Sequence, residues 1–277
     1  MDVTFWGVRG SIPCCGQEYL RVGGNSSCVS VIIDKKIVVF DAGTGLRDLG
    51  NWLEKHPYIN EAHLFLSHAH YDHIIGFPFF KPLWRKDFKL VVYSTIFGKY
   101  GGAKQFFEKR VFTDPFFPVT LEKLQCRLSF KDCQDNDRVT LDKETNVLIG
   151  KLNHPGGASG FRLQHRTKSV VYVSDTEHKE EELDSEVLNL IQGSDLVIYD
   201  ATFTEEEYPQ YKGWGHSTWQ EGMKLCQKAG AKSMAIYHHD PSHTDDVIDL
   251  IEKEATRAWS GLFIARQGMV ISLDEID

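Results

Sequence analysis

Residues 64–80, LFLSHAHYDHIIGFPFF, restrict the folds and functions open to this chain more than any other segment. An apolar run at 64–66 predicts a buried strand, which ends at Ser67. The next six residues contain three imidazoles and one carboxylate, at His68, His70, Asp72 and His73. Imidazole nitrogen and carboxylate oxygen are ligands that a borderline divalent cation takes, at about 2.0–2.2 Å. In an extended turn His68 and His70 point the same way, while Asp72 and His73 can face a neighbouring position. We therefore expect two adjacent metals rather than a polar loop with incidental histidines.

The amino-acid composition is that of an ordinary globular protein with a net negative charge. It has 277 residues, of which 42% are hydrophobic and 25% charged, and a formal net charge of −8. A negative balance disfavours broad binding to nucleic acid or to a membrane surface, because attraction to phosphates needs a basic face. The six cysteines show no CxxC spacing, which indicates reduced thiols and a cytoplasmic protein. Neither a secretory signal nor an apolar run of membrane-spanning length is present, so no membrane association is expected.

The order of predicted elements is mixed, with a strand-rich first half and alternating helices and strands afterwards. Strands are predicted at 2–9, 28–33, 37–40, 62–66, 89–93, 126–130, 146–152, 160–165, 169–173, 195–200, 233–237 and 262–272. Helices are predicted at 45–56, 101–110, 179–192, 217–229 and 244–257. No linker or internal repeat interrupts this order, so we expect a single domain over 1–277. Two facing sheets, each covered by helices, would accommodate both halves.

Four later apolar runs also end in residues that bind metals. These runs lead to His154, Asp175, Asp200 and the pair His238 and His239. Taken singly, such a residue is more typical of a turn or a cap than of a ligand. The cluster at 68–73 changes this interpretation, because two four-coordinate metals need about eight ligand contacts and the cluster supplies four. Loops at one end of a sheet would bring the remaining ligands to it.

Several motifs resemble the metallo-β-lactamase fold family. SHAHYDH resembles the HxHxDH signature of the family, FDAGTG (40–45) its early aspartate motif, NHPGG (153–157) its next histidine and SDT (174–176) its bridging aspartate. The stretch 215–241 resembles the one that closes the site in the phosphodiesterase branch that contains RNase Z. The resemblance runs from Phe5 to Pro241 and implies an α/β (α+β) fold, the four-layer αββα sandwich.

The resemblance also implies roles for individual residues. One metal would take His68, His70 and His154, the other Asp72, His73 and His238, and Asp175 would bridge both. His239 would take the place of His238 as the last ligand if the motif were shifted by one residue at this end. Zn²⁺ fits this donor set best, with Mn²⁺ as the alternative. A hydroxide held between the two metals would attack phosphorus. Asp72 and Asp175 would act in catalysis with His216, which would supply a proton to the leaving group. Asp41 would orient a ligand imidazole.

The finer resemblance is to enzymes that act on small substrates. FWGVRGSIP, GGNSSC and GFPFF look most like bacterial and phage hydrolases of 3′,5′-cyclic nucleotides, including those that counter anti-phage (Pycsar) immunity by destroying its pyrimidine cyclic nucleotides. Such relatives suggest a homodimer, in the bacterial cytosol or in the host cytosol if phage-encoded, with no stable nucleic-acid partner. Candidate substrate contacts are Asn25 and Ser27 in the Gly-rich loop, and Phe77 and Trp214 as stacking residues.

Three other functions compete with cyclic-nucleotide hydrolysis. An RNase Z-type endonuclease for tRNA precursors shares most motifs, but that branch usually carries a long basic Gly/Pro-rich arm, and none is found between the histidine cluster and Asp175. A non-enzymatic binding module is disfavoured by the complete ligand set. A β-lactamase or thioester hydrolase is disfavoured because the His216 motif belongs to the phosphodiesterase branch.

Overall fold

The computed structural model describes residues 1–179 and 181–275, and its strands form two seven-stranded sheets. The first sheet contains β1 (Asp2–Gly7), β2 (Cys28–Ile33), β3 (Lys36–Phe40), β4 (Glu61–Phe65), β5 (Lys89–Ser94), β6 (Arg127–Asp132) and β14 (Val270–Ser272), in the order β14-β1-β2-β3-β4-β5-β6. The second contains β7 (Arg138–Thr140), β8 (Thr145–Leu152), β9 (Ala158–His165), β10 (Lys168–Val173), β11 (Leu196–Asp200), β12 (Ser233–Tyr237) and β13 (Leu262–Ile264), in the order β13-β12-β11-β10-β9-β8-β7.

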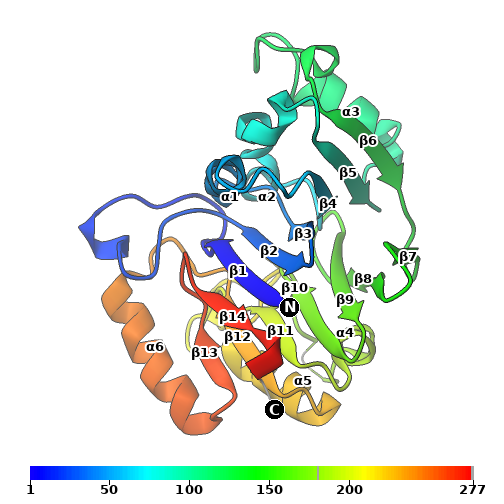
Figure 1. Cartoon of the computed structure of the whole chain (residues 1–277). Helices are drawn as coiled ribbons and strands as arrows, with labels where there is room; N and C mark the ends of the chain where they lie inside the picture. Colours follow the sequence, from blue (N-terminus) through cyan, green and yellow to red (C-terminus); the bar gives the residue numbers. More distant parts are fainter. Residues whose placement is uncertain (180, 276–277) are drawn as a thin grey trace.

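Helices cover the outer face of each sheet. The α-helices of the described residues are α1 (Gly45–Glu54), α2 (Tyr71–Ile74), α3 (Ala103–Arg110), α4 (Ser185–Ile191), α5 (Trp219–Ala229) and α6 (Asp245–Ala258). In α1 the buried residues Leu46, Leu49 and Leu53 recur at helical spacing, so one face packs on the first sheet. α3 packs on β6, while α4, α5 and α6 pack on strands of the second sheet (Figure 1). The predicted αββα sandwich is therefore confirmed.

The two sheets meet through a core of aromatic and branched side chains. Phe40 of β3 stacks on Tyr172 of β10 and on Phe161 of β9, with ring centroids 5.3 and 5.7 Å apart. Phe65 of β4 lies 5.5 Å from Phe161. All four rings are fully buried. These contacts fix the two sheets face to face and hence the separation of the strand ends above them.

The parallel strands of both sheets point their carboxyl ends to the same edge. β3 and β4 are parallel neighbours in the first sheet, and β10, β11 and β12 are parallel in the second. β8 runs in the same direction as β10, because each pairs antiparallel with β9 between them. The residues that follow these strands therefore gather at one edge of the sandwich.

The structure differs from the sequence prediction at several elements. The helix predicted at 179–192 begins only at Ser185, because the Asp184 side chain accepts hydrogen bonds from the amides of Glu186 and Val187 and caps it. Residue 180 of that prediction lies outside the described residues. The strand predicted at 262–272 is two strands in different sheets, joined through Gly268 at a φ of 84°. The short strand β7 and the one-turn helix α2 were not predicted.

Removing one ring of the inter-sheet core should destabilise the fold. We expect Phe40→Ala to lower the free energy of unfolding by about 3–5 kcal/mol, because the substitution leaves a cavity between Phe161 and Tyr172. Urea titration followed by circular dichroism measures this. The control Tyr58→Ala removes a ring that is 60% exposed and should change the free energy by no more than about 0.5 kcal/mol. Equal losses in both variants would contradict the packing described.

Candidate active site

The first group of converging side chains lies at the ends of β4, β8 and β10. It contains His68, His70, His154 and Asp175, whose ligand atoms all lie within 4.8 Å of one another. The Nε2 of His154 is 3.3 Å from the Nδ1 of His70, and the Nε2 of His68 is 3.4 Å from the Oδ2 of Asp175. His70 is exposed and the other three are buried. The group is therefore open to solvent on the His70 side.

The second group comes from the short helix α2 and from the end of β12. It contains Asp72, His73 and His238, all buried. The Nε2 atoms of His73 and His238 are 3.3 Å apart, and the Nε2 of His238 is 3.3 Å from the Oδ2 of Asp72. α2 aims Asp72 and His73 at this second position, separately from His68 and His70. His239 is turned away, with its Nε2 2.9 Å from the carbonyl of Ala265.

Asp175 lies between the two groups and offers one oxygen to each. Its Oδ2 is 3.4 Å from His68 and 3.9 Å from His154. Its Oδ1 is 3.2 Å from both His73 and His238. Burial alone would raise the pKa of Asp175, but the three imidazoles of His238, His73 and His68 hold that pKa well below its usual value. The carboxylate is therefore ionised and placed to bridge two cations.

The outer nitrogens of the imidazoles are satisfied by the protein. The Nδ1 of His73 is 2.7 Å from Asp41, that of His154 is 2.9 Å from the carbonyl of Gly215, and that of His238 is 2.9 Å from the hydroxyl of Thr202. The Nδ1 of His68 is 3.0 Å from the hydroxyl of Ser67, which itself donates to Asp41. Such contacts fix the rotation of an imidazole and leave its other nitrogen directed at a metal.

The inner nitrogens of the imidazoles face one another, and one of them lacks a hydrogen-bond partner, which tests whether cations fit here. The Nε2 of His68 is buried and has no hydrogen-bond partner. Burial, followed by the neighbouring imidazoles, keeps the pKa of His68 well below its usual value, so its imidazole is neutral. Because the hydroxyl of Ser67 donates to Asp41, it accepts from the Nδ1 of His68, which leaves Nε2 unprotonated. Five imidazoles and two carboxylates converge without a thiolate, a donor set that suits divalent cations such as Zn²⁺. The residues fit two divalent metal ions.

His216 lies beside both groups and is held by Asp200. Its Nδ1 is 2.9 Å from the Oδ2 of Asp200, and its ring is 5.0 Å from that of His238 and 5.6 Å from that of His154. Burial lowers the stability of its charged form, but the charge and hydrogen bond of Asp200 prevail and raise the pKa of His216 to about 9. Cations bound next to this ring would bring that pKa down. His216 can therefore hold a proton at Nε2 and release it towards the site.

Asp200 is a functional residue whose role the sequence did not reveal. It accepts from the amide of Thr176 and from both the amide and the hydroxyl of Thr202. These three hydrogen bonds fix the orientation of the carboxylate. The available signal was the apolar run DLVIY that ends in Asp200, the same layout that precedes Asp175.

Glu177 is a second residue that sequence reasoning missed. Its carboxylate accepts from the hydroxyl of Tyr208 and from the amides of Gly213 and Gly215, at 2.7–2.9 Å. The carbonyl of Gly215 in turn contacts His154, and His216 follows it in the chain. Glu177 thus ties the segment before His216 to the strand end that carries the other candidate ligands.

The N-terminal loop closes over the second group. Ser11 has a φ of 60°, and its amide donates to the Oδ2 of Asp72 at 2.8 Å. Gly10 lies against the ring of His238, where a Cβ would come within 2.5 Å of the imidazole. Arg9 is fully buried and donates to the carbonyls of Gly23 and His243, which holds both ends of the loop. A side chain at position 10 would displace either the loop or the candidate ligand.

Two of the four proposed substrate contacts, Ser27 and Phe77, face the protein interior. Ser27 and Phe77 are fully buried, and Phe77 packs on Phe107 at 4.7 Å, so it has no face on which a base could stack. The amide of Asn25 donates to Asp48 and its oxygen accepts from Thr44. The expectations for Ser27 and Phe77 are corrected, because both side chains are fully buried, whereas Asn25 is half-buried and stays a prediction. Trp214 is 63% exposed, two positions before His216, and stays a prediction.

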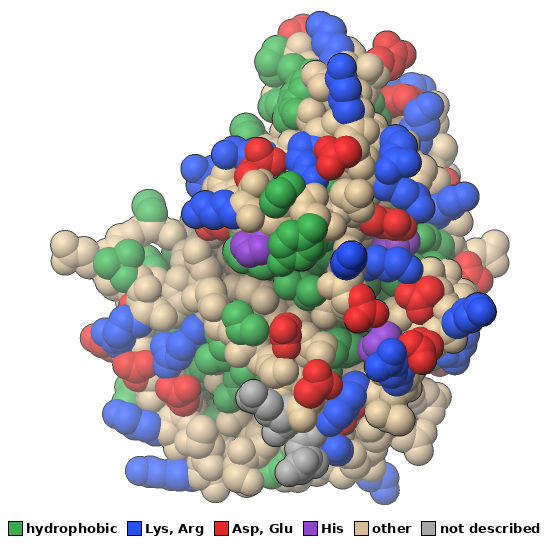
Figure 2. All heavy atoms as spheres, in the orientation of Figure 1, with side chains coloured by type: hydrophobic (Ala, Val, Ile, Leu, Met, Phe, Trp, Pro, Cys, Tyr) green, Lys and Arg blue, Asp and Glu red, His purple; other side chains and the backbone are tan. Residues whose placement is uncertain are grey.

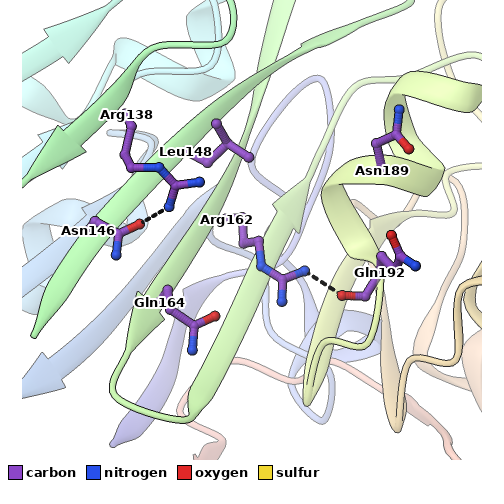
Figure 3. Close-up of a pocket in the computed structure, with 7 residues that line it drawn as sticks. All are labelled: Arg138, Asn146, Leu148, Arg162, Gln164, Asn189 and Gln192. Atoms are coloured by element: carbon purple, nitrogen blue, oxygen red, sulfur yellow. Dashed lines mark hydrogen bonds between the residues drawn. The ribbon is translucent and has the colours of Figure 1, made fainter.

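A separate cavity of about 340 Å³ lies on the outer face of β7, β8 and β9 beside α4 (Figure 3). Arg138 there donates to Asn146, and Arg162 donates to the backbone carbonyls of Leu190 and Gln192. Both guanidinium groups thus have protein partners, and no described residue lining the cavity is a histidine or a carboxylate. This cavity has no metal-binding chemistry.

Comparison with known proteins agrees with this geometry. Residues 36–239 match the sequence profile of the Beta-lactamase superfamily domain. The chain belongs to this superfamily. Ribonuclease Z of Haloarcula marismortui is 26% identical over an alignment that covers 97% of this chain and 96% of that protein. Among solved structures, the metallo-β-lactamase fold protein YhfI from Bacillus subtilis has a TM-score of 0.73 at 19% identity, and the two chains are each covered to 98%. The short form of human tRNase Z has a TM-score of 0.65 at 20% identity, with 99% of each chain covered.

The fold, the superfamily match and the His/Asp clusters together support a metal-dependent hydrolase. Within the described residues, no helix has the length and apolar character that crossing a membrane requires. The single-domain, homodimer and cytoplasmic expectations stay predictions.

Asp175 should be necessary for both metals if it bridges them. We expect wild-type protein to bind two Zn²⁺ per chain and Asp175→Ala to bind close to none, because the shared carboxylate is removed from both groups. Inductively coupled plasma mass spectrometry after dialysis measures the content. The control Asp135→Ala, an exposed carboxylate, should bind as wild type does. A fully loaded Asp175→Ala protein would exclude the bridging role.

Glu177 should control the order of the segment before His216. We expect Glu177→Ala to speed amide exchange at Gly213 and Gly215 by at least about tenfold, because each loses a bond to a charged acceptor. Hydrogen exchange followed by mass spectrometry reports this. The control Glu181→Ala removes an exposed carboxylate nearby and should leave the exchange unchanged. Unaltered exchange in Glu177→Ala would show that other contacts hold the segment.

Proposed function

We propose that this protein is a dinuclear-metal phosphodiesterase that hydrolyses 3′,5′-cyclic nucleotides. The observation that carries the proposal is the position of Asp175, with one oxygen towards each group of imidazoles and His216 beside them. Two cations with a shared carboxylate suit phosphodiester hydrolysis, since they lower the pKa of bound water to about 7 and neutralise charge that develops on phosphoryl oxygens.

The protein residues would perform the remaining tasks. His68, His70 and His154 would hold one cation, while Asp72, His73 and His238 would hold the other. His216 would carry a proton at Nε2, because its Nδ1 is bonded to Asp200, and give it to the oxygen that leaves phosphorus. Ser11 and Gly10 cover Asp72 and His238 of the second group, whereas His70 of the first group is exposed, so substrate would enter past His70.

A small substrate is favoured by charge and by chain length. In the view of Figure 2, acidic and basic side chains are interspersed on the visible face, which lacks the continuous basic surface that a tRNA needs. The alignment with the Haloarcula relative spans 316 positions and this chain has 277 residues, so at least 39 positions of that relative have no counterpart here. A shorter chain has fewer elements with which to hold a large RNA.

The second candidate is an RNase Z-type endoribonuclease that acts on tRNA precursors. Relatives named Ribonuclease Z match nearly the full length of this chain, at 26% identity in Haloarcula marismortui and 23% in Porphyromonas gingivalis. The two candidate functions share the metal site and differ in the part of the substrate that lies beyond the scissile phosphate.

One assay separates the two candidates. Purified protein with Zn²⁺ or Mn²⁺ should be given 3′,5′-cyclic nucleotides, a precursor tRNA and bis-p-nitrophenyl phosphate.

We expect hydrolysis of cyclic nucleotides and of the generic diester, with the precursor tRNA left intact. Cleavage of the precursor at its 3′ side without cyclic-nucleotide hydrolysis would replace the first candidate by the second. Loss of all three activities in metal-loaded protein would exclude a phosphodiesterase.

His216 should affect turnover and leave metal binding intact. We expect His216→Ala to retain two metals per chain and to lower kcat by about a hundredfold or more, within the usual range of general-acid effects. Steady-state kinetics and metal analysis on the same sample measure both. His56→Ala is the matched control, since His56 contacts Trp52 and lies outside the site. Turnover unaffected by the His216 substitution would remove that residue from the mechanism.

A further inference from the structure

A small cavity opens directly from the first group of candidate ligands. His68 and His70 line one end of it, and its volume is about 230 Å³. This is smaller than the roughly 300–1,000 Å³ of most ligand sites, and so suits one ring system better than a large ligand. Because His70 is the exposed member of its group, the cavity lies on the side from which the site is accessible.

The walls of this cavity differ in character. One wall comes from the segment between β5 and α3 and carries Tyr100, with the buried ring of Phe106 5.5 Å behind it. The other wall is the backbone of Gly156 and Gly157, which follow His154. A Cβ at either glycine would meet nothing within 4 Å, so the space beside this backbone is free. The cavity thus has an aromatic wall, an opposite wall without side chains, and candidate metal ligands at its end.

Lys99 gives the cavity its charge. Among the described residues that line it, Lys99 carries the only permanent charge. Its ammonium lies 5.2 Å from the centroid of the Tyr100 ring, and the guanidinium of Arg110 lies 5.1 Å from the same ring. These two cations hold the tyrosine in place by cation–π attraction. The lysine itself is exposed, and its ammonium can donate up to three hydrogen bonds to a ligand with acceptor atoms.

We infer that this cavity holds the nucleobase of the substrate, with Tyr100 and Phe106 as its aromatic wall and Lys99 donating to acceptor atoms on the base. The inference rests on the proposed cyclic-nucleotide hydrolysis. The phosphodiester lies at the candidate metal ligands, and the base extends from it past His70 towards Tyr100. The charge and the aromatic ring complement a flat heterocycle with carbonyl or ring-nitrogen acceptors.

The kinetic signature follows from where these contacts are made. The base is remote from phosphorus and is held equally in the bound substrate and in the transition state, so its loss raises KM with little effect on kcat. We expect Tyr100→Ala to raise KM for 3′,5′-cyclic nucleotides by about tenfold, within the range of a lost aromatic contact, and to change kcat by no more than about threefold. Tyr100→Phe keeps the ring and should leave KM close to the wild-type value, whereas Lys99→Ala should raise KM about fivefold, as expected for one lost hydrogen bond.

The experiment uses the full-length, metal-loaded protein and the four common 3′,5′-cyclic nucleotides. The control variants are Tyr58→Ala and Lys86→Ala, because both residues are exposed and line no cavity described here. Both should leave kcat and KM unchanged. Metal content and thermal unfolding of each variant identify any that are misfolded, and calorimetric binding of a slowly hydrolysed phosphorothioate analogue measures affinity without turnover.

The outcomes separate the cavity from the proposed function. If wild-type protein hydrolyses cyclic nucleotides and Tyr100→Ala leaves both KM and analogue affinity unchanged, the base lies elsewhere and the proposed function stands. A fall in kcat alone would also overturn the inference, because it would place Tyr100 near the reacting atoms. If wild-type protein turns over bis-p-nitrophenyl phosphate and no cyclic nucleotide, the proposed function fails, and the inference about the cavity fails with it.

Discussion

The carboxylate of Asp175 is the group on which the rest of the site depends. An ionised carboxylate buried away from water is stable only when opposite charges surround it, and without them it would take up a proton. Here imidazoles approach each of its oxygens, at 3.2 Å on one side and 3.4 Å on the other. The same carboxylate would serve as the one ligand that a pair of cations shares. Removing it would therefore leave the two groups of imidazoles without the one ligand that they share.

The backbone is strained where it presents this carboxylate. Asp41, Asp175 and His238 have φ values of 60°, 59° and 62°, in the left-handed region that non-glycine residues avoid. Each such residue costs about 1–3 kcal/mol, which the surrounding structure must offset. All three lie just after a strand, so the left-handed residue turns its side chain across the edge of the sheet. The aromatic core between the sheets holds the strands firmly enough to sustain that geometry, which links packing far from the site to the position of the ligands.

Sequence predicted the parts of the site that depend on local order. The histidine cluster, the apolar runs before His154, Asp175 and His238, and the two-sheet sandwich all follow from strand periodicity and from what stands at the strand ends. The residues whose roles were missed depend on contacts between distant segments. Asp200 gains its role only through His216, and Glu177 only through the amides of Gly213 and Gly215. Phe77 was misassigned because proximity in sequence to the cluster says nothing about which way a ring faces, and this one faces the core.

The chemistry of the site depends on residues at the strand ends, whereas its selectivity depends on the connections between strands. The candidate ligands follow strands whose pairing fixes them, and their outer nitrogens are bonded to Asp41, Thr202 and backbone carbonyls. The walls beside them come from longer connections, namely the segment between β5 and β6, at the top of Figure 1, and the loop between β1 and β2. Loops of this kind can change in length and composition without moving a strand. A metal centre fixed by the sheets can therefore serve substrates of very different size, because the connections and not the ligands decide what fits next to the scissile bond.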